Sequence, residues 1–299
     1  MPEIRKVAIA GASGTLGQHV FKALVDTGFE VTVLTRSKKP GAYELAIEVL
    51  VVDFTSVESL TSSLKGIDAV VSTISGEATD TQTILIDAAV AAGVKRFIPS
   101  EFGSVSTNPK LESFPYYSNM ANIRKHLRNN STTGEFTWTV LACGAFLEFV
   151  LNMPKVLDFK NHTATILDDG DNRVSSTSMP VVGMAIAAIL KNFDATKNKI
   201  LHASEVIWTQ NQLLGFAKEL NPGTKWEISK AQTSVLVKES LEQIRAGDVS
   251  MPVMLKLILG TALAGDTYGG VYDVTDNKLL GINELTTDDL KTLIAGKLA

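Results

Sequence analysis

The stretch Lys6-Val-Ala-Ile-Ala-Gly-Ala-Ser-Gly-Thr-Leu-Gly17 decides the fold. Its first five residues form a short apolar run, typical of a strand buried on both faces of a parallel sheet. Three glycines follow with G-x-x-G-x-x-G spacing, and apolar residues recur at helical intervals after Leu16. Such a turn lets the backbone approach a pyrophosphate, which the amino end of the helix attracts, although the same glycines would also suit a helix packed closely on a strand. The cofactor-binding residues predicted here are Gly11, Ser13, Gly14, Thr15, Leu16 and Gly17.

The same alternation of strand and helix patterns continues to about residue 150. It predicts an α/β fold with a Rossmann-type doubly wound parallel sheet, because right-handed crossovers pack helices back onto a twisted sheet. The strands expected after the first lie at 30–34, within 45–53, and at 68–72, 96–100 and 137–142, and further helices are expected at 80–92 and 117–130.

Beyond residue 150 the pattern becomes irregular. Strand patterns at 163–167 and 174–177 flank an acidic loop and predict a hairpin or edge strands, and helical patterns follow them. We divide the chain into a nucleotide-binding domain over residues 1–152 and a smaller, mostly helical substrate-binding cap over 153–299. Part of the cap, about residues 180–205, is expected to return to the first sheet. Ligands bind at the carboxyl ends of such strands, so we expect the cleft between the two parts.

The composition excludes several classes of protein. Of the 299 residues, 45% are hydrophobic and 20% are charged, and the net charge of −4 disfavours a nucleic-acid partner. The longest apolar-rich stretch, 252–265, contains Lys256 and is shorter than the ~20 residues that span a bilayer, so no membrane partner is expected. Cys143 has no disulfide partner, and the four histidines lack the spacing of metal ligands. The first ten residues enter a strand pattern directly, so we expect a cytoplasmic location. The oligomeric state is left open.

The residues after the second strand select the coenzyme. An NAD site would place a carboxylate there for the ribose 2′-hydroxyl, whereas this chain has Arg36, Lys38 and Lys39. NADPH is therefore the predicted cofactor, with Arg36 and Lys39 near its extra phosphate; the alternative is a solvated basic loop. The other coenzyme contacts predicted are Asp53 and Phe54 beside the adenine, and Thr73 and Ser75 on the nicotinamide side.

Three further segments carry a family resemblance: Val71-Ser-Thr-Ile-Ser75, Lys95-Arg-Phe-Ile-Pro-Ser-Glu-Phe-Gly103 and Ala121-Asn-Ile-Arg-Lys125. With the glycine turn and Arg36, they resemble the isoflavone reductase and phenylcoumaran benzylic ether reductase group of the NmrA-like, atypical short-chain dehydrogenases, and a fungal member in particular. The resemblance implies an NADPH-dependent reductase of a small conjugated, aromatic or carbonyl-type substrate, in secondary metabolism. It also implies that Ser100 and Phe102 contact the cofactor and that Glu101 contacts the substrate.

One position departs from that pattern. The reductases carry a lysine, the proposed general acid or base, where this chain has Met120. A thioether cannot titrate, whereas a lysine ammonium has three donors and a tunable pKa. Tyr116, one helical turn earlier, leaves the Tyr-x-x-x-Lys pair of ordinary short-chain dehydrogenases half present. The candidate catalytic residues are Met120, Tyr116 and Tyr117.

Three interpretations of Met120 stay open. It is an inactivating substitution that holds substrate without turnover, or it belongs to a catalyst that needs no lysine. Such a catalyst would be a rearrangement enzyme or a reductase whose product is protonated by Tyr116, Tyr117 or water. In the third interpretation the chain is an NADP(H)-binding regulator without chemistry.

The substrate side is predicted from apolar residues beyond the sixth strand. Phe146, Phe149 and Met153 would line an apolar pocket over the nicotinamide, or alternatively pack the seam between sheet and cap. Relatives often carry a carboxylate at the start of the helix near residue 183, where this chain has Val181. We interpret Cys143 as a small buried residue rather than a nucleophile.

Overall fold

A seven-stranded parallel sheet forms the first part of the molecule. The computed structural model describes residues 4–38, 41, 43–74 and 80–298. The strand order is β11-β6-β5-β4-β1-β2-β3, and every neighbouring pair is parallel, which confirms the predicted doubly wound sheet. The order reverses between β1 and β4, so ligands are expected at the carboxyl ends of these two strands. The strands are β1 (Lys6–Ala10), β2 (Glu30–Thr35), β3 (Glu48–Val51), β4 (Ala69–Ser72), β5 (Arg96–Ile98), β6 (Thr137–Ala142) and β11 (Lys199–His202).

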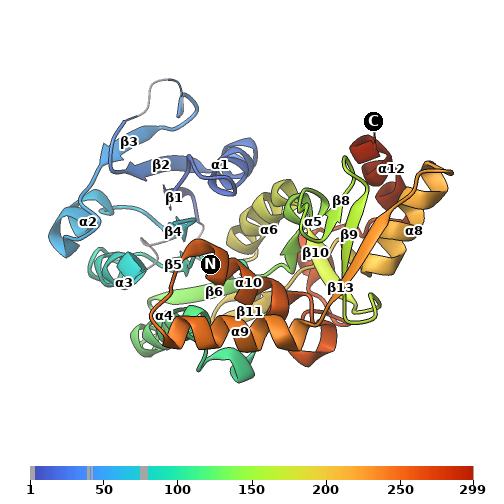
Figure 1. Cartoon of the computed structure of the whole chain (residues 1–299). Coiled ribbons are helices and arrows are strands. Elements are labelled where there is room, and N and C mark those ends of the chain that lie inside the picture. The colour runs from blue at the N-terminus through green and yellow to red at the C-terminus, as the bar shows by residue number, and fades with distance from the viewer. Residues whose placement is uncertain (1–3, 39–40, 42, 75–79, 299) are drawn as a thin grey trace.

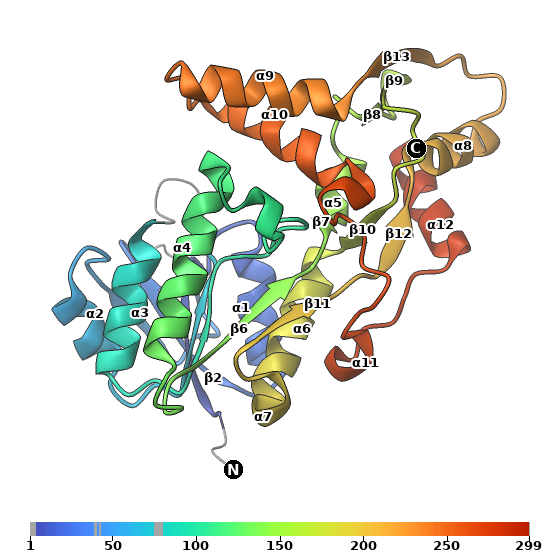
Figure 2. The same cartoon turned by 90° about the horizontal axis from the view of Figure 1, so that it is seen from below.

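Helices cover both faces of this sheet (Figures 1 and 2). On one face α1 and α6 bury their apolar residues against β1 and β2, and on the other face α2, α3 and α4 form a second core. Two separate cores on one sheet explain why its strands are almost continuously apolar. The helices of this part are α1 (Gly17–Asp26), α2 (Val57–Ser63), α3 (Gln82–Ala91), η2 (Pro109–Leu111), α4 (Pro115–Asn130), α6 (Met179–Lys191) and α7 (Phe193–Thr196).

The cap contains two three-stranded sheets, ordered β12-β10-β7 and β13-β9-β8, together with helices. It takes in residues 145–151, ahead of the predicted boundary at residue 152, because β7 pairs with β10 and the helix after it packs into the cap core. The hairpin or edge strands expected at 163–167 and 174–177 are wrong in both forms: β9 and β10 belong to different sheets, so they form no hairpin, and each is the middle strand of its own sheet. The acidic loop between them anchors a helix instead: the Asp168 carboxylate accepts hydrogen bonds from the backbone and hydroxyl of Thr233, at 2.9 and 2.8 Å. The strands are β7 (Ala145–Phe146), β8 (Leu157–Asp158), β9 (Thr163–Leu167), β10 (Val174–Thr177), β12 (Val206–Trp208) and β13 (Glu227–Ala231).

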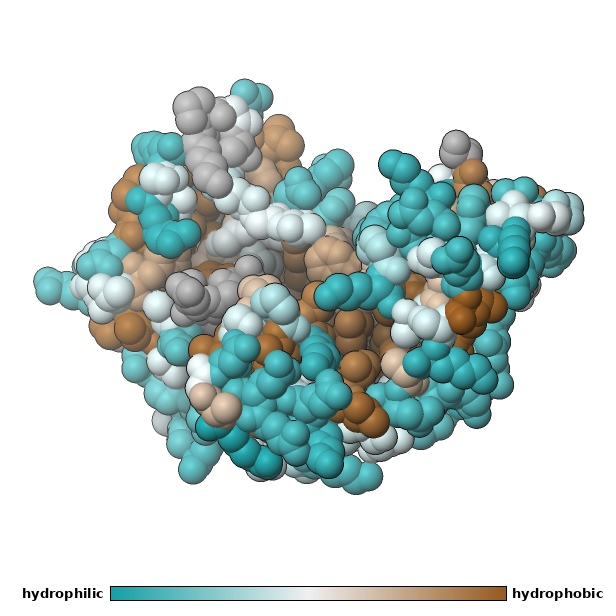
Figure 3. Space-filling view, viewed as in Figure 1, coloured by the Kyte–Doolittle hydropathy of each residue, from teal (hydrophilic) through white to brown (hydrophobic). Residues whose placement is uncertain are grey.

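The helices α9 and α10 of the cap pack against each other and reach across toward α4 (Figure 2). Between the two parts of the molecule the surface is hollowed, and apolar residues lie on the floor of this hollow (Figure 3). Within the described ranges, no helix combines the length and apolar character needed to cross a membrane. The cap helices are α5 (Leu147–Leu151), α8 (Gln210–Leu220), α9 (Thr233–Arg245), α10 (Met251–Ala262), η3 (Gly265–Thr267), α11 (Asn277–Leu280) and α12 (Thr287–Leu298).

Candidate cofactor and substrate site

The glycine turn lies at the reversal of strand order, between the end of β1 and the start of α1. The Gly14 amide donates to the Gly11 carbonyl at 2.9 Å, and Gly11 has φ +89°. A Cβ on Gly11 would lie 2.8 Å from the Thr73 backbone, and one on Gly17 would lie 2.0 Å from the Gly11 oxygen. Both contacts are too short for any side chain, so the turn requires glycine at both positions. Helix α1 begins at Gly17, and the amides of Gln18, His19 and Val20 donate to the carbonyls of Gly14 and Leu16. The amino end of the helix still places partial positive charge at the turn, which favours an anion there.

The other residues of this turn differ in exposure. Ser13, Gly14 and Thr15 are exposed, while Leu16 is half-buried against the core under α1. A tight backbone with small exposed residues, ahead of a helix amino end, fits the diphosphate of a dinucleotide.

Arg36 follows the end of β2, the strand next to β1, and its side chain is exposed. The turn that carries it is held by Thr35, whose hydroxyl donates to the Ser37 carbonyl at 2.8 Å. A guanidinium beside the phosphate turn fits the bidentate recognition of a further phosphate group. Lys39, predicted beside Arg36, lies outside the described residues.

Asp53 and Phe54 follow β3, one strand further out. The exposed Asp53 carboxylate accepts from the backbone and hydroxyl of Thr55 at 2.8 and 2.6 Å, and these bonds lower its pKa. Phe54 is half-buried against the core under α2 and α3. Asp53 is thus charged and held at the sheet edge, and its contact with adenine stays a prediction.

Thr73, directly after β4, is hydrogen-bonded to the end of β1, so it links the two strands between which the strand order reverses. Its backbone amide and hydroxyl both donate to the Ala10 carbonyl, at 2.8 and 2.9 Å. Its side chain therefore borders the glycine turn directly. Ser75, the neighbouring predicted contact, lies outside the described residues.

The segment after β5 is held from two sides. The Ser100 amide donates to the Gln82 side chain at 2.7 Å, and Ser100 is half-buried. Phe102 is buried in the sheet core, and its carbonyl accepts from the thiol of Cys143 at 3.0 Å. Burial raises the pKa of that thiol, so Cys143 stays protonated and is a poor nucleophile.

Glu101 is buried in an ion pair, whereas the resemblance implies that it contacts the substrate. Its side chain is 1% exposed and forms an ion pair with Arg124 of α4, which is equally buried. Arg124 also donates to the Ser106 carbonyl at 3.1 Å and to Glu112 at 3.0 Å. Burial raises the pKa of Glu101. The pair joins two of the segments that carry the family resemblance, those with Glu101 and Arg124, so it positions the loop after β5 against α4.

The candidate catalytic residues lie on the first turns of α4. Tyr116 and Met120 are half-buried, and Tyr117 is buried with its hydroxyl 2.5 Å from the hydroxyl of Thr261 in α10. The two tyrosine rings meet edge to face at 5.1 Å. Burial raises the pKa of both phenols, so both stay protonated at neutral pH. The Tyr117 hydroxyl is therefore hydrogen-bonded to the cap. Met120 packs on the cluster formed by Val105, Leu111 and Tyr117.

The predicted substrate residues lie at the junction of sheet and cap. Phe146 is half-buried against the sheet core, Met153 is half-buried against the cap core, and Phe149 is 50% exposed. The rings of Phe146 and Phe149 meet edge to face at 5.6 Å. These residues form part of the seam, with Phe149 on its open side, and a contact with substrate stays a prediction.

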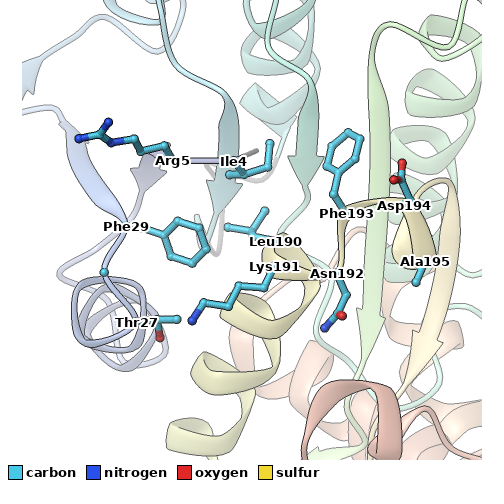
Figure 4. Close-up of a pocket in the computed structure, with 11 residues that line it drawn as sticks. Ile4, Arg5, Thr27, Phe29, Leu190, Lys191, Asn192, Phe193, Asp194 and Ala195 are labelled. Atoms are coloured by element: carbon cyan, nitrogen blue, oxygen red, sulfur yellow. The ribbon is translucent and has the colours of Figure 1, made fainter. Parts of the chain in front are cut away.

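A separate groove of about 870 Å³ lies at the opposite edge of the sheet, near the amino ends of β1 and β2 (Figure 4). Ile4, Phe29 and Leu190 form its apolar part, and Lys191 extends across toward Thr27. Because the glycine turn follows the carboxyl end of β1, this groove is not the dinucleotide site.

The profile of the NmrA-like family matches residues 3–269. The chain belongs to this family. It is 31% identical to the oxidoreductase aprR of Aspergillus flavus over 95% of this chain and 97% of that protein. It is 24% identical to the oxidoreductase poxI of Penicillium oxalicum over 95% and 92% of the two chains, and 27% identical to the isoflavone reductase homolog P3 of Arabidopsis thaliana over 89% of each. The predicted NmrA-like, isoflavone reductase-like resemblance is therefore confirmed.

Solved structures share the fold of this chain. An isoflavone reductase superposes with a TM-score of 0.75 at 22% identity, over 98% of this chain and 99% of that chain. The leucoanthocyanidin reductase of Vitis vinifera, in a binary complex with NADPH, gives a TM-score of 0.75 at 21% identity over the same shares. At these identities the likeness establishes the fold.

Contacts that join the cap to the loop after β5 could not be predicted from the sequence. The Asn108 side chain donates to the Tyr268 carbonyl at 2.7 Å, and the Tyr272 hydroxyl donates to the Ser104 carbonyl. These partners are separated by 160 and 168 positions. No local pattern marks them, because each is an ordinary polar residue in a loop.

Proposed function

We propose that this protein is an NADPH-dependent reductase of a small conjugated, aromatic or carbonyl-type substrate, acting in secondary metabolism. One observation carries the proposal: a glycine turn with no room for a Cβ lies at the strand-order reversal, one strand from the exposed guanidinium of Arg36. The fungal relatives named as oxidoreductases support the activity, and the fold neighbour in complex with NADPH supports the coenzyme. A cytoplasmic location and the absence of a nucleic-acid partner stay predictions.

Each part of the site would have its own role in binding the coenzyme and positioning the reacting atoms. The turn at Gly11–Gly17 and the amino end of α1 would hold the diphosphate, and Arg36 the 2′-phosphate. Thr73 would border the nicotinamide ring. The coenzyme supplies a hydride when bound, and the protein supplies position and exclusion of water. The Glu101–Arg124 pair would keep the loop after β5 in place beside the reacting atoms.

The coenzyme preference is tested by titrating the protein with NADPH and with NADH. We expect NADPH to bind more tightly by at least about tenfold, because Arg36 pairs with the extra phosphate. The variant Arg36→Ala should lose most of this preference while still binding NADH. The control Lys197→Ala removes a positive charge before β11, at the amino edge of the sheet, and should leave both affinities unchanged. Equal affinities in the unaltered protein, or tighter binding of NADH, would contradict the proposal.

A second candidate, an NADP(H)-binding regulator without turnover, is favoured by one observation. Met120 cannot titrate, and the Tyr117 hydroxyl is bonded to Thr261. The regulator would bind the coenzyme with the same preference but oxidise none of it with any small conjugated acceptor. An isomerase that requires the coenzyme would form product without net oxidation. Measuring coenzyme oxidation by absorbance and product formation in the same reaction distinguishes the three functions. A reductase shows both, an isomerase shows product alone, and a regulator shows neither.

A further inference from the structure

An aromatic wall lies where α4 meets the cap. We use this name for Phe114, Tyr116, Met120 and Tyr268, four partly exposed side chains packed around the buried Tyr117. The rings of Phe114 and Tyr268 meet edge to face at 6.3 Å. Tyr116 and Met120 are one helical turn apart, so they share one face of α4. Because each member keeps exposed surface, the wall can contact a ligand.

The wall lies beside the coenzyme edge of the sheet. Asn119, the neighbour of Met120, donates a side-chain hydrogen bond to the carboxylate of Asp80, which begins the approach to α3 after β4. The other side of the wall is fixed to the cap through Tyr117 and Thr261. A ligand on the wall would therefore lie between the nucleotide-binding sheet and α10, where the substrate is expected.

The charges around the wall favour a cation. Residues 113–123 contain no lysine or arginine, and the next cation, Arg124, is buried between two carboxylates, those of Glu101 and Glu112. A carboxylate, that of Asp80, is joined to this part of α4 through the Asn119 side chain. Aromatic faces and a polarisable thioether attract a cationic ligand, whereas a lysine at position 120 would repel it.

We propose that the acceptor bound at this wall is a cation of the iminium class. The inference rests on the proposed reductase function and specifies its substrate. The iminium carbon accepts the hydride and forms a C–H bond, and the electron pair of the C=N double bond becomes the nitrogen lone pair. The substrate leaves as a neutral amine, the nicotinamide takes up the positive charge, and no proton is transferred. Reduction of a carbonyl would need a proton at oxygen. Met120 has none to give and the Tyr117 hydroxyl is engaged, which leaves Tyr116 as the one phenol of α4 that could donate, whereas reduction of an iminium ion needs no donor.

Binding of an unreactive cation tests this without turnover. The probe is N,N-dimethyl-1,2,3,4-tetrahydroisoquinolinium, and its neutral carbon analogue is 2,2-dimethyltetralin; both are titrated into the protein with NADPH present. We expect the cation to bind more tightly by about tenfold, the range of a desolvated cation–π site. Met120→Lys should remove this preference and leave the affinity for the neutral analogue within about threefold. Met120→Leu should keep the preference, as should Met184→Lys, which adds the same charge at an exposed position of α6.

Turnover gives an independent reading. N-methyl-3,4-dihydroisoquinolinium and the ketone α-tetralone share one bicyclic skeleton, and both are offered with NADPH. We expect the unaltered protein to reduce the iminium ion, and Met120→Lys to shift the ratio of the two rates toward the ketone. If NADPH binds but the cation and its neutral analogue bind equally, or if Met120→Lys leaves the cation affinity unchanged, the inference is wrong and the reductase function stands. If NADPH itself does not bind, the proposed function fails.

Discussion

At the scale of single residues, the geometry of the glycine turn is set by local sterics. Gly11 and Gly17 are required because a Cβ on Gly11 would meet the backbone of Thr73, and a Cβ on Gly17 would meet the carbonyl of Gly11. The position of Arg36 follows from the end of one strand. The ion pair of Glu101 could not be predicted from the sequence. Its partner Arg124 lies 23 positions away, and nothing in the local pattern around Glu101 indicates a buried ion pair.

Gly17→Ala tests the turn directly. The added methyl would lie 2.0 Å from the Gly11 carbonyl oxygen, so the turn must open. We expect weaker NADPH binding by at least about tenfold and a lower melting temperature. The matched control is Gly215→Ala in α8, where the new methyl meets nothing within 4 Å. That change should leave coenzyme binding unaltered and raise stability by up to about 1 kcal/mol. Unchanged NADPH affinity in Gly17→Ala would show that the diphosphate lies elsewhere.

His202 gives the protein a pH-dependent stability. Burial lowers its pKa from 6.5, with Asp276 opposing the shift, and its ring meets Tyr272 at 4.8 Å. The unfolded chain therefore binds the proton more tightly than the folded chain does. We expect the free energy of unfolding to fall as the pH drops below about 6.5, measured by urea denaturation. In His202→Phe this fall should be shallower; parallel curves for the two proteins would contradict the assignment.

At the scale of elements, helix positions follow from apolar periodicity, but the partners of their ends do not. The first turn of α6 has no acidic residue of its own, and Val181 stands where the family resemblance implies a carboxylate. Two distant carboxylates replace it: Glu148 accepts from the Met179 amide at 3.0 Å, and Glu205 accepts from the Ser178 amide at 2.5 Å. The expected hairpin at 163–177 failed for a related reason, since strand patterns do not reveal which strands pair.

Replacing one of these carboxylates should weaken α6. Glu148→Gln removes the charge that faces the amino end of the helix while keeping the shape of the side chain. We expect a loss of about 1–2 kcal/mol in the free energy of unfolding, the range of a charge-assisted hydrogen bond. The control Glu239→Gln breaks an exposed pair with Lys256 and should cost less than about 1 kcal/mol. Equal losses in the two variants would mean that the Glu148 carboxylate does not cap α6.

At the scale of the whole molecule, the cap is fastened to the nucleotide-binding part through the loop after β5 and the start of α4. Tyr117 bonds Thr261, Asn108 bonds the backbone of Tyr268, and Tyr272 bonds the backbone of Ser104. The Glu101–Arg124 ion pair holds the same loop against α4. The position of the cap and the position of the substrate-side loop are therefore set by one group of contacts, all of them long-range and invisible to sequence periodicity.

A double-mutant cycle on Tyr117 and Thr261 measures how strongly this fastening contributes. Tyr117→Phe removes the phenol that lies 2.5 Å from the Thr261 hydroxyl, while the ring stays in its cluster. Thr261→Val removes the partner but also its bond to the Leu257 carbonyl, so the single variants alone would mislead. We expect a coupling free energy of about 1 kcal/mol in urea denaturation, the net value of a buried hydrogen bond. Additive losses would show that the two hydroxyls do not interact in solution. With coupling, hydrogen exchange in α10 should quicken in Tyr117→Phe, because its tie to α4 has been cut.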